Sequence, residues 1–188
     1  MRRIASIYLA GPDQWFPDAE AHAKRKTELC GDAGFVGITA LDSFLVETEP
    51  SEVMARERYA DAIGRVRQCD ALIANLTPWR GPNSDPATAF EVGFASALGK
   101  PVFAYLNVAS EEEADHAERV AMTVGARVDE DGRVIDENGC EVEDFGLPEN
   151  LMLWAEARKF FVIVTPDPLN DLTGLELALD ALRVYADA

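Results

Sequence analysis

The sequence has few cysteines, histidines and basic residues. Among its 188 residues are three cysteines, Cys30, Cys69 and Cys140, and two histidines, with no CxxC pair. This set lacks the ligand spacing of a zinc site, so we expect no metal and reduced thiols packed in the interior. Lys and Arg number 17 against 34 Asp and Glu, a formal charge of −17. Binding to nucleic-acid phosphates needs a basic surface, so we expect no nucleic-acid partner.

Long apolar runs and glycine-rich phosphate loops are also missing. No apolar segment approaches the roughly 20 residues that span a bilayer, and no secretory signal follows Met1. We therefore expect a cytoplasmic protein with no membrane partner. Neither GxGxxG nor GxxxxGK[ST] occurs, which argues against a dinucleotide or nucleoside triphosphate cofactor. We expect no cofactor.

Short apolar runs alternate with helical patterns along the chain, as in a parallel α/β sheet. The predicted strands are residues 4–10, 35–39, 71–76, 101–106 and 161–165, and the predicted helices are residues 18–33, 52–69, 86–98, 150–160 and 172–186. Residues 107–149 break the pattern, because they are rich in acidic residues and hold Asp-Gly and Asn-Gly pairs that favour tight β-turns. We expect one domain over residues 1–188: a flavodoxin- or Rossmann-like parallel sheet of about five strands flanked by helices, with a β-hairpin insertion near 107–149.

Ligands of such sheets bind beyond the carboxyl ends of the strands. These ends correspond to residues 8–16, 39–44 and 75–85. The first segment carries Tyr8, which core packing alone would explain, and the aromatic pair Trp15-Phe16. Two large aromatic rings in a Gly/Pro/Asp loop suit a lid that stacks on a flat ligand, although ordinary packing would also account for them.

Glu91 is the most informative residue. Asp85 and Pro86 predict the start of a helix, and the apolar stripe of that helix uses Ala87, Phe94 and Leu98. Glu91 falls within this stripe, where a carboxylate is costly unless it is paired or faces a cavity. The ordinary alternative is a Glu at the edge of the stripe, bonded to a neighbouring loop. Buried acids cluster at functional sites, so we favour a functional role.

Four segments, in order along the chain, resemble the nucleoside 2-deoxyribosyltransferases. They are IYLAGP (7–12), CDALIANLTPWRG (69–81), DPATAFEVGFASALGKPV (85–102) and FGLPENLMLW (145–154). The resemblance implies transfer of 2-deoxyribose from a 2′-deoxynucleoside to a free nucleobase. It makes Glu91 the nucleophile that holds the sugar as a covalent ester, the double-displacement chemistry of retaining glycosidases.

The same resemblance implies roles for the residues around Glu91. Tyr8 orients Glu91, and Asp85 binds sugar hydroxyls, although capping of its helix is an equal explanation from the residues alone. Gly11 belongs to the substrate-binding segment, and Trp15 and Phe16 form the aromatic lid. Asn150 reaches into the pocket of a neighbouring subunit to bind the 5′-hydroxyl. A shared site of this kind implies a homo-oligomer, a dimer or larger.

The sequence departs from the family at the base-binding position of the second helix. The family places Asp or Asn eight residues before the aspartate that opens the third strand, and counting back from Asp70 reaches Ala62. Asp61 is adjacent, but helix phase puts it opposite the inward face formed by Tyr59, Ile63 and Val66. Either the helix is over-wound and Asp61 turns inward, or the group is missing, and we favour its absence. The proton donor to the leaving base is then open, and Asp42 or Phe44 becomes a candidate base contact.

Two other functions fit the same residues. A related N-glycosidase would pass the sugar of a nucleoside or its 5′-phosphate to water, but Asp85 would repel the phosphate. A non-catalytic nucleoside or nucleotide sensor would explain Ala62, but it would not require Tyr8, Asp85, Glu91 and Asn150 together.

Overall fold

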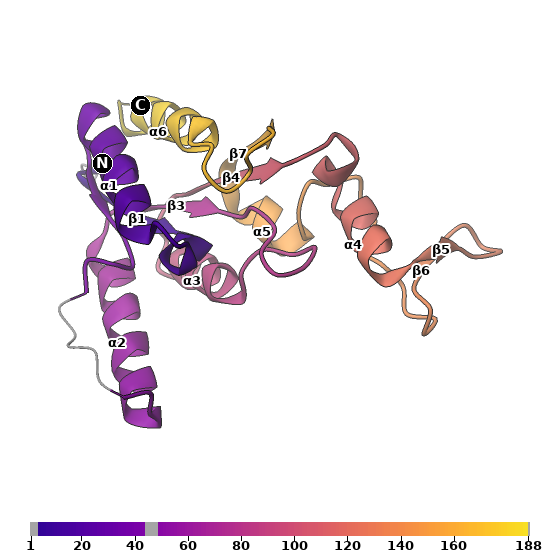
Figure 1. Ribbon diagram of the computed structural model, residues 1–188. Helices are drawn as coiled ribbons and strands as arrows, with labels where there is room; N and C mark the ends of the chain where they lie inside the picture. The colour runs from indigo at the N-terminus through magenta and orange to yellow at the C-terminus, as the bar shows by residue number, and fades with distance from the viewer. Residues whose placement is uncertain (1–3, 44–48, 188) are drawn as a thin grey trace.

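The computed structural model describes residues 4–43 and 49–187, and its centre is a five-stranded parallel sheet (Figure 1). The strand order is β2-β1-β3-β4-β7. The strands are β1 (Ser6–Ala10), β2 (Val36–Ile38), β3 (Ala71–Asn75), β4 (Val102–Val108) and β7 (Ala157–Val164). The predicted α/β class and five-stranded sheet are confirmed.

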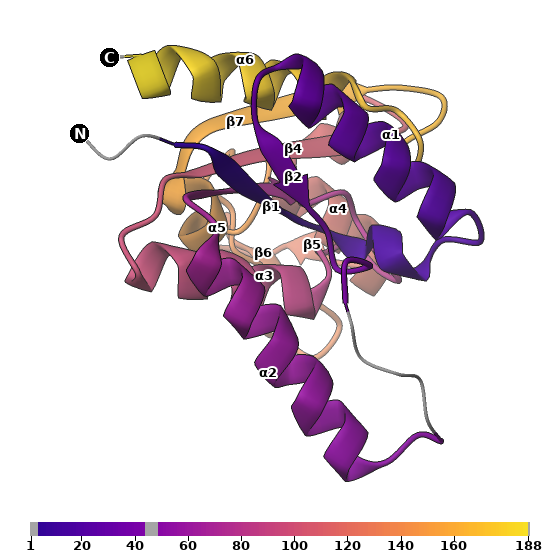
Figure 2. The same cartoon turned by 90° about the vertical axis from the view of Figure 1, so that its left-hand side faces the viewer.

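Helices cover both faces of the sheet (Figure 2). On one face, α1 (Ala19–Asp32) and α6 (Thr173–Asp187) pack over a cluster that includes Ile7, Phe103 and Leu175. On the other face lie α2 (Glu52–Gln68), α3 (Pro86–Ala97) and the short α5 (Leu151–Glu156). Strands buried on both sides carry continuous apolar runs, which explains why β1, β3 and β4 show no polar alternation.

The pleat of β1 determines which side chains meet which helices. Successive side chains of a strand point to opposite faces. Ile7 and Leu9 therefore join the cluster under α1 and α6, whereas Tyr8 and Ala10 join the cluster under α2 and α3. This places the Tyr8 ring beneath the helix that carries Glu91.

The start and end of α3 follow the sequence. Asp85 is its N-cap, and its Oδ2 accepts a hydrogen bond of 3.0 Å from the amide of Thr88. Pro86 occupies the first turn, where its missing N–H costs nothing. The predicted stop is confirmed, because Gly99 has a φ of 70° and adopts the left-handed conformation that favours glycine after a helix.

The predicted apolar stripe of α3 is wrong in phase. The buried residues are Thr88, Val92 and Ala95, whereas Ala87 and Leu98 are exposed. Leu98 is the C-cap residue at the end of the helix, where its side chain is exposed. Glu91 lies three residues after Thr88 and four before Ala95, and it therefore still falls on the side of α3 that faces the sheet.

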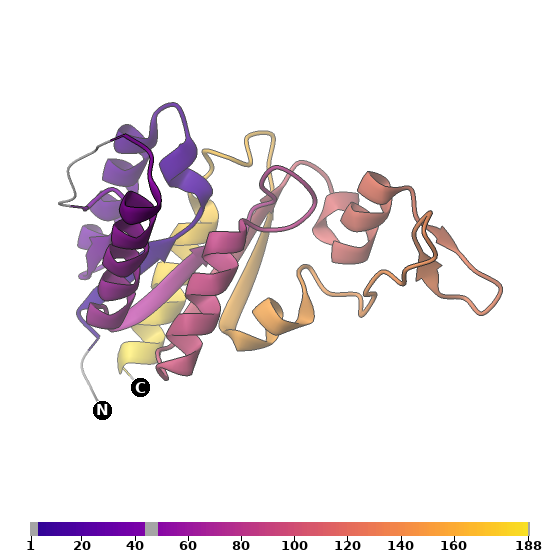
Figure 3. The same ribbon diagram turned by 90° about the horizontal axis from the view of Figure 1, so that it is seen from below.

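Two predictions about the second half of the chain need correction. The helix expected over 150–160 ends at Glu156, and β7 begins at Ala157 because this run pairs with β4 from Val102 onward. The insertion contains the predicted hairpin, β5 (Arg127–Val128) and β6 (Val134–Ile135), but also an unpredicted helix, α4 (His116–Val124), and the short η2 (Glu112–Ala114). Asp115 caps α4 and Gly125 ends it. Figures 1 and 3 show this insertion as an arm that extends away from the sheet.

A buried arginine fixes the base of the arm. Arg119 donates hydrogen bonds to the carbonyls of Pro82, Glu113 and Pro148, at 2.6 to 3.0 Å. It also lies 3.7 Å from the Glu149 carboxylate, which is itself buried. These contacts join α4 to the loop that precedes α3, so the arm is fastened to the same loop that leads to Asp85.

Cys30 and Cys69 are buried, as expected of structural thiols, but Cys140 is exposed in the arm. Within residues 4–43 and 49–187, no helix combines the length and apolarity that crossing a membrane requires.

Candidate active site

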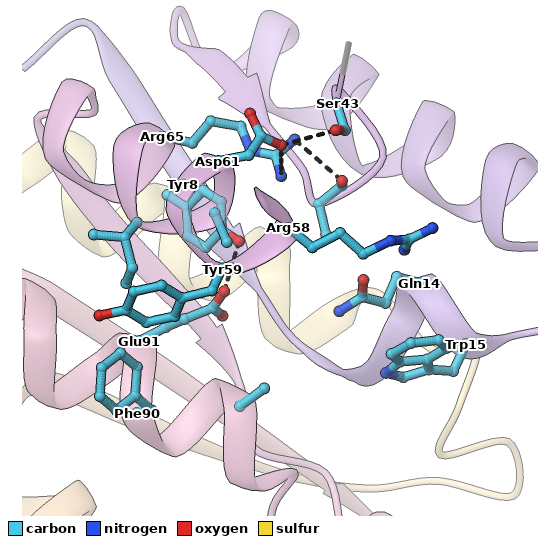
Figure 4. A pocket seen from close by; sticks show the side chains of 14 residues that line it. Tyr8, Gln14, Trp15, Ser43, Arg58, Tyr59, Asp61, Arg65, Phe90 and Glu91 are labelled. Atoms are coloured by element: carbon cyan, nitrogen blue, oxygen red, sulfur yellow. Dashed lines mark hydrogen bonds and ion pairs between the residues drawn. The ribbon is translucent and has the colours of Figure 1, made fainter. Parts of the chain in front are cut away.

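A cavity of about 420 Å³ lies beyond the carboxyl ends of β1 and β2, between α2 and α3 (Figure 4). Part of its wall comes from the 3-10 helix η1 (Pro12–Trp15), which follows β1. The described residues that line it are Tyr8, Gln14, Trp15, Ala40, Ser43, Arg58, Tyr59, Asp61, Ala62, Ile63, Arg65, Ala87, Phe90 and Glu91. A space of this size suits a small organic ligand.

Tyr8 and Glu91 form a hydrogen-bonded pair in this cavity. The Tyr8 hydroxyl donates to Oε1 of Glu91 at 2.7 Å, although 83 residues separate the two in sequence. Tyr8 is buried and Glu91 is partly exposed to the cavity. The edge-of-stripe alternative places the partner of Glu91 in a loop, but the observed partner is a strand residue.

The pKa of Glu91 is raised to about 7, chiefly by burial and also by the nearby charge of Asp85. The Tyr8 hydrogen bond, Arg65 and Lys26 act in the opposite direction. Burial, followed by the negative charge of Glu91, raises the pKa of Tyr8 far above its usual value, so its hydroxyl remains a donor at physiological pH. Glu91 thus titrates near neutrality while it holds a neutral hydrogen-bond donor, an arrangement typical of functional carboxylates.

Asp85 is buried at the start of α3, one turn and a half before Glu91. Its Oδ2 accepts from both the amide and the hydroxyl of Thr88. It lies outside the set of described residues that line the cavity. Asp85 therefore caps α3 in the structure. Its negative charge also raises the pKa of Glu91.

Asp61 lines the cavity, so the expectation that helix phase turns it away is wrong. The inward residues Ile63 and Val66 are buried against the sheet, but Arg58, Asp61, Ala62 and Arg65 follow a neighbouring stripe of α2 that faces the cavity. The helix α2 extends past the carboxyl ends of the strands (Figure 2). One of its faces therefore packs against the sheet, and a neighbouring face lines the cavity. Asp61 Oδ2 accepts from Ser43 Oγ at 2.8 Å and lies 2.8 Å from Nη2 of Arg65.

The two aromatic residues of the first loop have different surroundings. Trp15 is 53% exposed and lines the cavity. Phe16 is buried instead, with its ring 5.3 Å from His22 and 5.5 Å from Trp79 between centroids. Phe16 therefore anchors the loop in the interior, and the predicted aromatic lid reduces to Trp15 in the described structure. Gly11 is packed so closely that an added Cβ would lie 2.9 Å from Cβ of Asn75.

Of the two candidates at the end of β2, Asp42 is not among the described residues that line the cavity. Asp42 is exposed, and its carboxylate accepts from the amide and the hydroxyl of Thr39. Phe44 lies outside the described residues. Ala40 and Ser43 are the described residues of this segment that line the cavity.

Asn150 belongs to another part of the chain. It caps α5 through a hydrogen bond from the Met152 amide, and its Nδ2 donates to Glu143 at 3.0 Å. It is absent from the described residues that line the cavity of its own chain. Within one chain, Asn150 and Glu91 are therefore not brought together.

Several lining residues escaped the sequence analysis. Tyr59 and Phe90 place two rings side by side, 6.1 Å apart between centroids, on one wall. Gln14, which was not predicted, lies beside the predicted Trp15 on another part of the wall, as Figure 4 shows. Arg65 carries a signal that could have identified it, because it follows Asp61 by four residues, the spacing of an ion pair along a helix.

Comparisons with known proteins identify the family of the chain. The profile of the nucleoside 2-deoxyribosyltransferase family matches residues 7–152. A 2-deoxyribosyltransferase of known structure from Leishmania mexicana is 27% identical, with a TM-score of 0.67, and the match covers 96% of this chain and 98% of that one. A CMP N-glycosidase from Clostridium botulinum is 18% identical, with a TM-score of 0.43 over 96% of this chain and 98% of that one.

A curated but uncharacterized protein of Schizosaccharomyces pombe is 32% identical over 103 residues. The match covers 53% of this chain, and this chain spans about half of that protein's length, 49%. The family profile, by contrast, extends from β1 through the start of α5 and includes both Tyr8 and Glu91. The chain belongs to the nucleoside 2-deoxyribosyltransferase family.

Proposed function

We propose that the protein transfers 2-deoxyribose between nucleobases through a covalent ester on Glu91. The observation that supports this proposal is the Tyr8–Glu91 hydrogen bond of 2.7 Å inside a cavity of ligand size. Tyr8 holds one carboxylate oxygen, which leaves the other for the anomeric carbon of the sugar. A carboxylate in this environment suits an oxocarbenium-like transition state, which it stabilises electrostatically.

The reaction has two balanced steps. In the first, a Glu91 oxygen forms a bond to C1′, the C1′–N bond breaks, and its electron pair leaves with the base, which takes up a proton. In the second, a ring nitrogen of the acceptor base attacks C1′, loses its proton, and the ester bond breaks to restore the Glu91 carboxylate. Configuration at C1′ is retained because each step inverts it.

We propose that the sugar hydroxyls bind Asp85, two residues before the cavity-lining Ala87, and Asn150 of a second copy. Asp85 is the N-cap of the helix that carries Glu91. Asn150 lies outside the cavity of its own chain, which supports a role in a neighbouring one. The active form is then a homo-oligomer.

We place the base against α2. Asp61 provides a carboxylate on that wall, Trp15 provides a stacking surface, and Tyr59 and Phe90 add apolar rings. Arg65 is already bonded to Asp61 and to the carbonyl of Ala40. These bonds disfavour its use as a phosphate ligand, so nucleosides are preferred over their 5′-phosphates.

Incubation with a 2′-deoxynucleoside and a different free base tests the proposal. We expect chromatography to show the exchanged nucleoside, and mass spectrometry without acceptor to show a deoxyribosyl adduct on Glu91. Release of free sugar at every acceptor concentration would instead identify a hydrolase. Binding without turnover would identify a sensor.

Asp85→Ser tests the sugar end of the site. Removing the carboxylate should improve the use of a deoxynucleoside 5′-phosphate relative to the nucleoside, because a negative charge near the phosphate is lost. An unchanged ratio of kcat/KM for the two substrates would show that Asp85 acts as a cap alone.

A further inference from the structure

Arg65 occupies an unusual position on the cavity wall. Its side chain is 11% exposed. Its two terminal nitrogens bind two different partners. Nη2 lies 2.8 Å from Oδ2 of Asp61, and Nη1 donates to the carbonyl of Ala40 at 3.1 Å. Ser43 donates to the same Asp61 oxygen at 2.8 Å. One guanidinium thus connects α2 to the segment that follows β2, as seen beside Tyr8 in Figure 4.

The same helix contains a comparison pair. Arg56 and Glu52 also have i,i+4 spacing and a contact of 2.7 Å, but their side chains are 78% and 79% exposed. Exposed pairs of this kind contribute little to stability, because water screens the charges and the side chains lose entropy. The Arg65–Asp61 pair is shielded and has a third partner in Ser43. Its geometry is therefore more strongly determined than that of the exposed pair.

We infer that Arg65 is a positioning residue for the transfer reaction: its guanidinium holds Asp61 toward the bound base and fixes α2 against the end of β2. This inference rests on the proposed function. It gives Arg65 the task of orienting the Asp61 carboxylate. In the structure, Asp61 lies on the stripe of α2 next to the buried Ile63 and Val66, where it lines the cavity. The ion pair and the Ser43 hydrogen bond determine where its carboxylate points.

The charge of Arg65 also acts on the nucleophile. The charged or titratable groups that act on Glu91 are Tyr8 on β1, Arg65 on α2, Asp85 at the N-cap of α3 and, from the other side of the sheet, Lys26 on α1. Burial and Asp85 raise the pKa of Glu91, whereas Arg65 and Lys26 lower it. Arg65 also lowers the pKa of Tyr8. The residue that orients the base wall therefore favours the ionised nucleophile as well.

Two substitutions separate these effects. Arg65→Gln removes both the charge and the forked geometry. We expect the acidic limb of the kcat/KM profile to move to higher pH, with a loss of about tenfold at pH 6 beyond any loss at pH 8. Arg65→Lys keeps the charge but cannot reach Asp61 and Ala40 together. We expect it to retain the acidic limb of the wild type while the KM for the acceptor base rises about tenfold.

Arg56→Gln is the matched control and should leave both quantities unchanged. Binding of free base, measured by calorimetry, gives a readout that does not depend on turnover and should weaken in both Arg65 variants. A thermal melt shows whether Arg65→Gln is folded. If it is not, the inference is tested by the affinity of Arg65→Lys for the free base. Wild-type affinity for base in Arg65→Lys, or an unshifted acidic limb in folded Arg65→Gln, would overturn the inference. Absence of exchange in the wild type would instead contradict the proposed function.

Discussion

Asp13 and Glu91 are two shielded carboxylates on opposite sides of β1, and their partners differ. Asp13 is buried and bonded to Lys26, and its Oδ1 accepts from Nδ2 of Asn75 at 2.8 Å. His22 adds a further contact at 3.8 Å. Glu91 has the Tyr8 hydroxyl as its hydrogen-bond partner in the described structure, and no cation lies within ion-pair distance among the described residues.

The difference separates a structural carboxylate from a reactive one. A buried ion pair with further hydrogen bonds compensates the charge, and removal of one partner is costly. Asp13 therefore fixes η1, from which Gln14 and Trp15 reach the cavity. Glu91 has no such compensation for its burial among the described residues, and its pKa is therefore raised to about 7. Its carboxylate is available to interact with a substrate.

The largest expected effect comes from Glu91→Gln. The neutral amide keeps the size of the side chain but cannot attack C1′, so exchange should fall at least about a thousandfold. Steady-state exchange rates measure the loss, with exposed Glu52→Gln as the control. Substantial exchange by the variant would remove Glu91 from the mechanism.

Lys26→Met should reveal the structural role of Asp13. The variant leaves that carboxylate without its cation, and we expect the free energy of unfolding to fall by about 3–5 kcal/mol. Urea denaturation measures the change. Lys24→Met, on the same helix but 76% exposed, should cost far less. Equal losses in the two variants would contradict the contrast between Asp13 and Glu91.

Glu91→Gln should also change stability in a pH-dependent way. Folding raises the pKa of Glu91 from 4.5 to about 7, so the folded state favours the protonated acid. Wild-type stability from this group is complete below pH 4.5 and is lost as the pH rises through about 7. Gln does not titrate, so the variant should gain up to about 3 kcal/mol over the wild type above pH 7, and little at pH 4. An advantage that does not vary with pH would show that burial does not perturb Glu91.

Tyr8→Phe should produce a smaller loss and a shifted profile. The Tyr8 hydrogen bond lowers the pKa of Glu91, so its removal should move the acidic limb of kcat/KM to higher pH. We expect a loss of about 10- to 100-fold near neutral pH. Tyr105→Phe is a matched control, because the Tyr105 hydroxyl is buried and has no hydrogen-bond partner among the described residues. A profile that keeps its position in Tyr8→Phe would contradict the role of the hydroxyl.

Trp15→Ala should have the smallest effect. Loss of a stacking surface on the exposed loop should raise the KM for the base about three- to tenfold and leave kcat nearly unchanged. A change confined to kcat would show that Trp15 acts on the chemical step instead.

The sequence predicts the sheet better than it predicts the cavity. Uncharged runs and the Asp85-Pro86 start locate β1, β3 and α3, because these features depend on local residues. The start of β7 at Ala157 depends on pairing with β4, which overrides the helical pattern before it. In the arm, α4 follows from its Asp115 cap and Gly125 stop, a local signal that the turn pairs after it obscured.

Glu91 was found because a carboxylate near the sheet is conspicuous, even though the predicted phase of α3 was wrong. Asp61 was placed on the outer side because its direction depends on Arg65 and Ser43. The second of these comes from a different part of the chain, 18 residues away. Contacts of this kind become visible only when the end of β2 and the middle of α2 are placed in space.

The cavity is assembled from two walls of separate origin. Tyr8 and Glu91 come from β1 and α3, whereas Asp61, Arg65 and Ser43 come from α2 and the segment after β2. Combinatorial libraries limited to residues 58–65 can therefore vary the shape and polarity of one wall while the Tyr8–Glu91 contact stays intact. The arrangement makes this protein a tractable starting point for engineering acceptor range, with selection for altered bases acting on one helix.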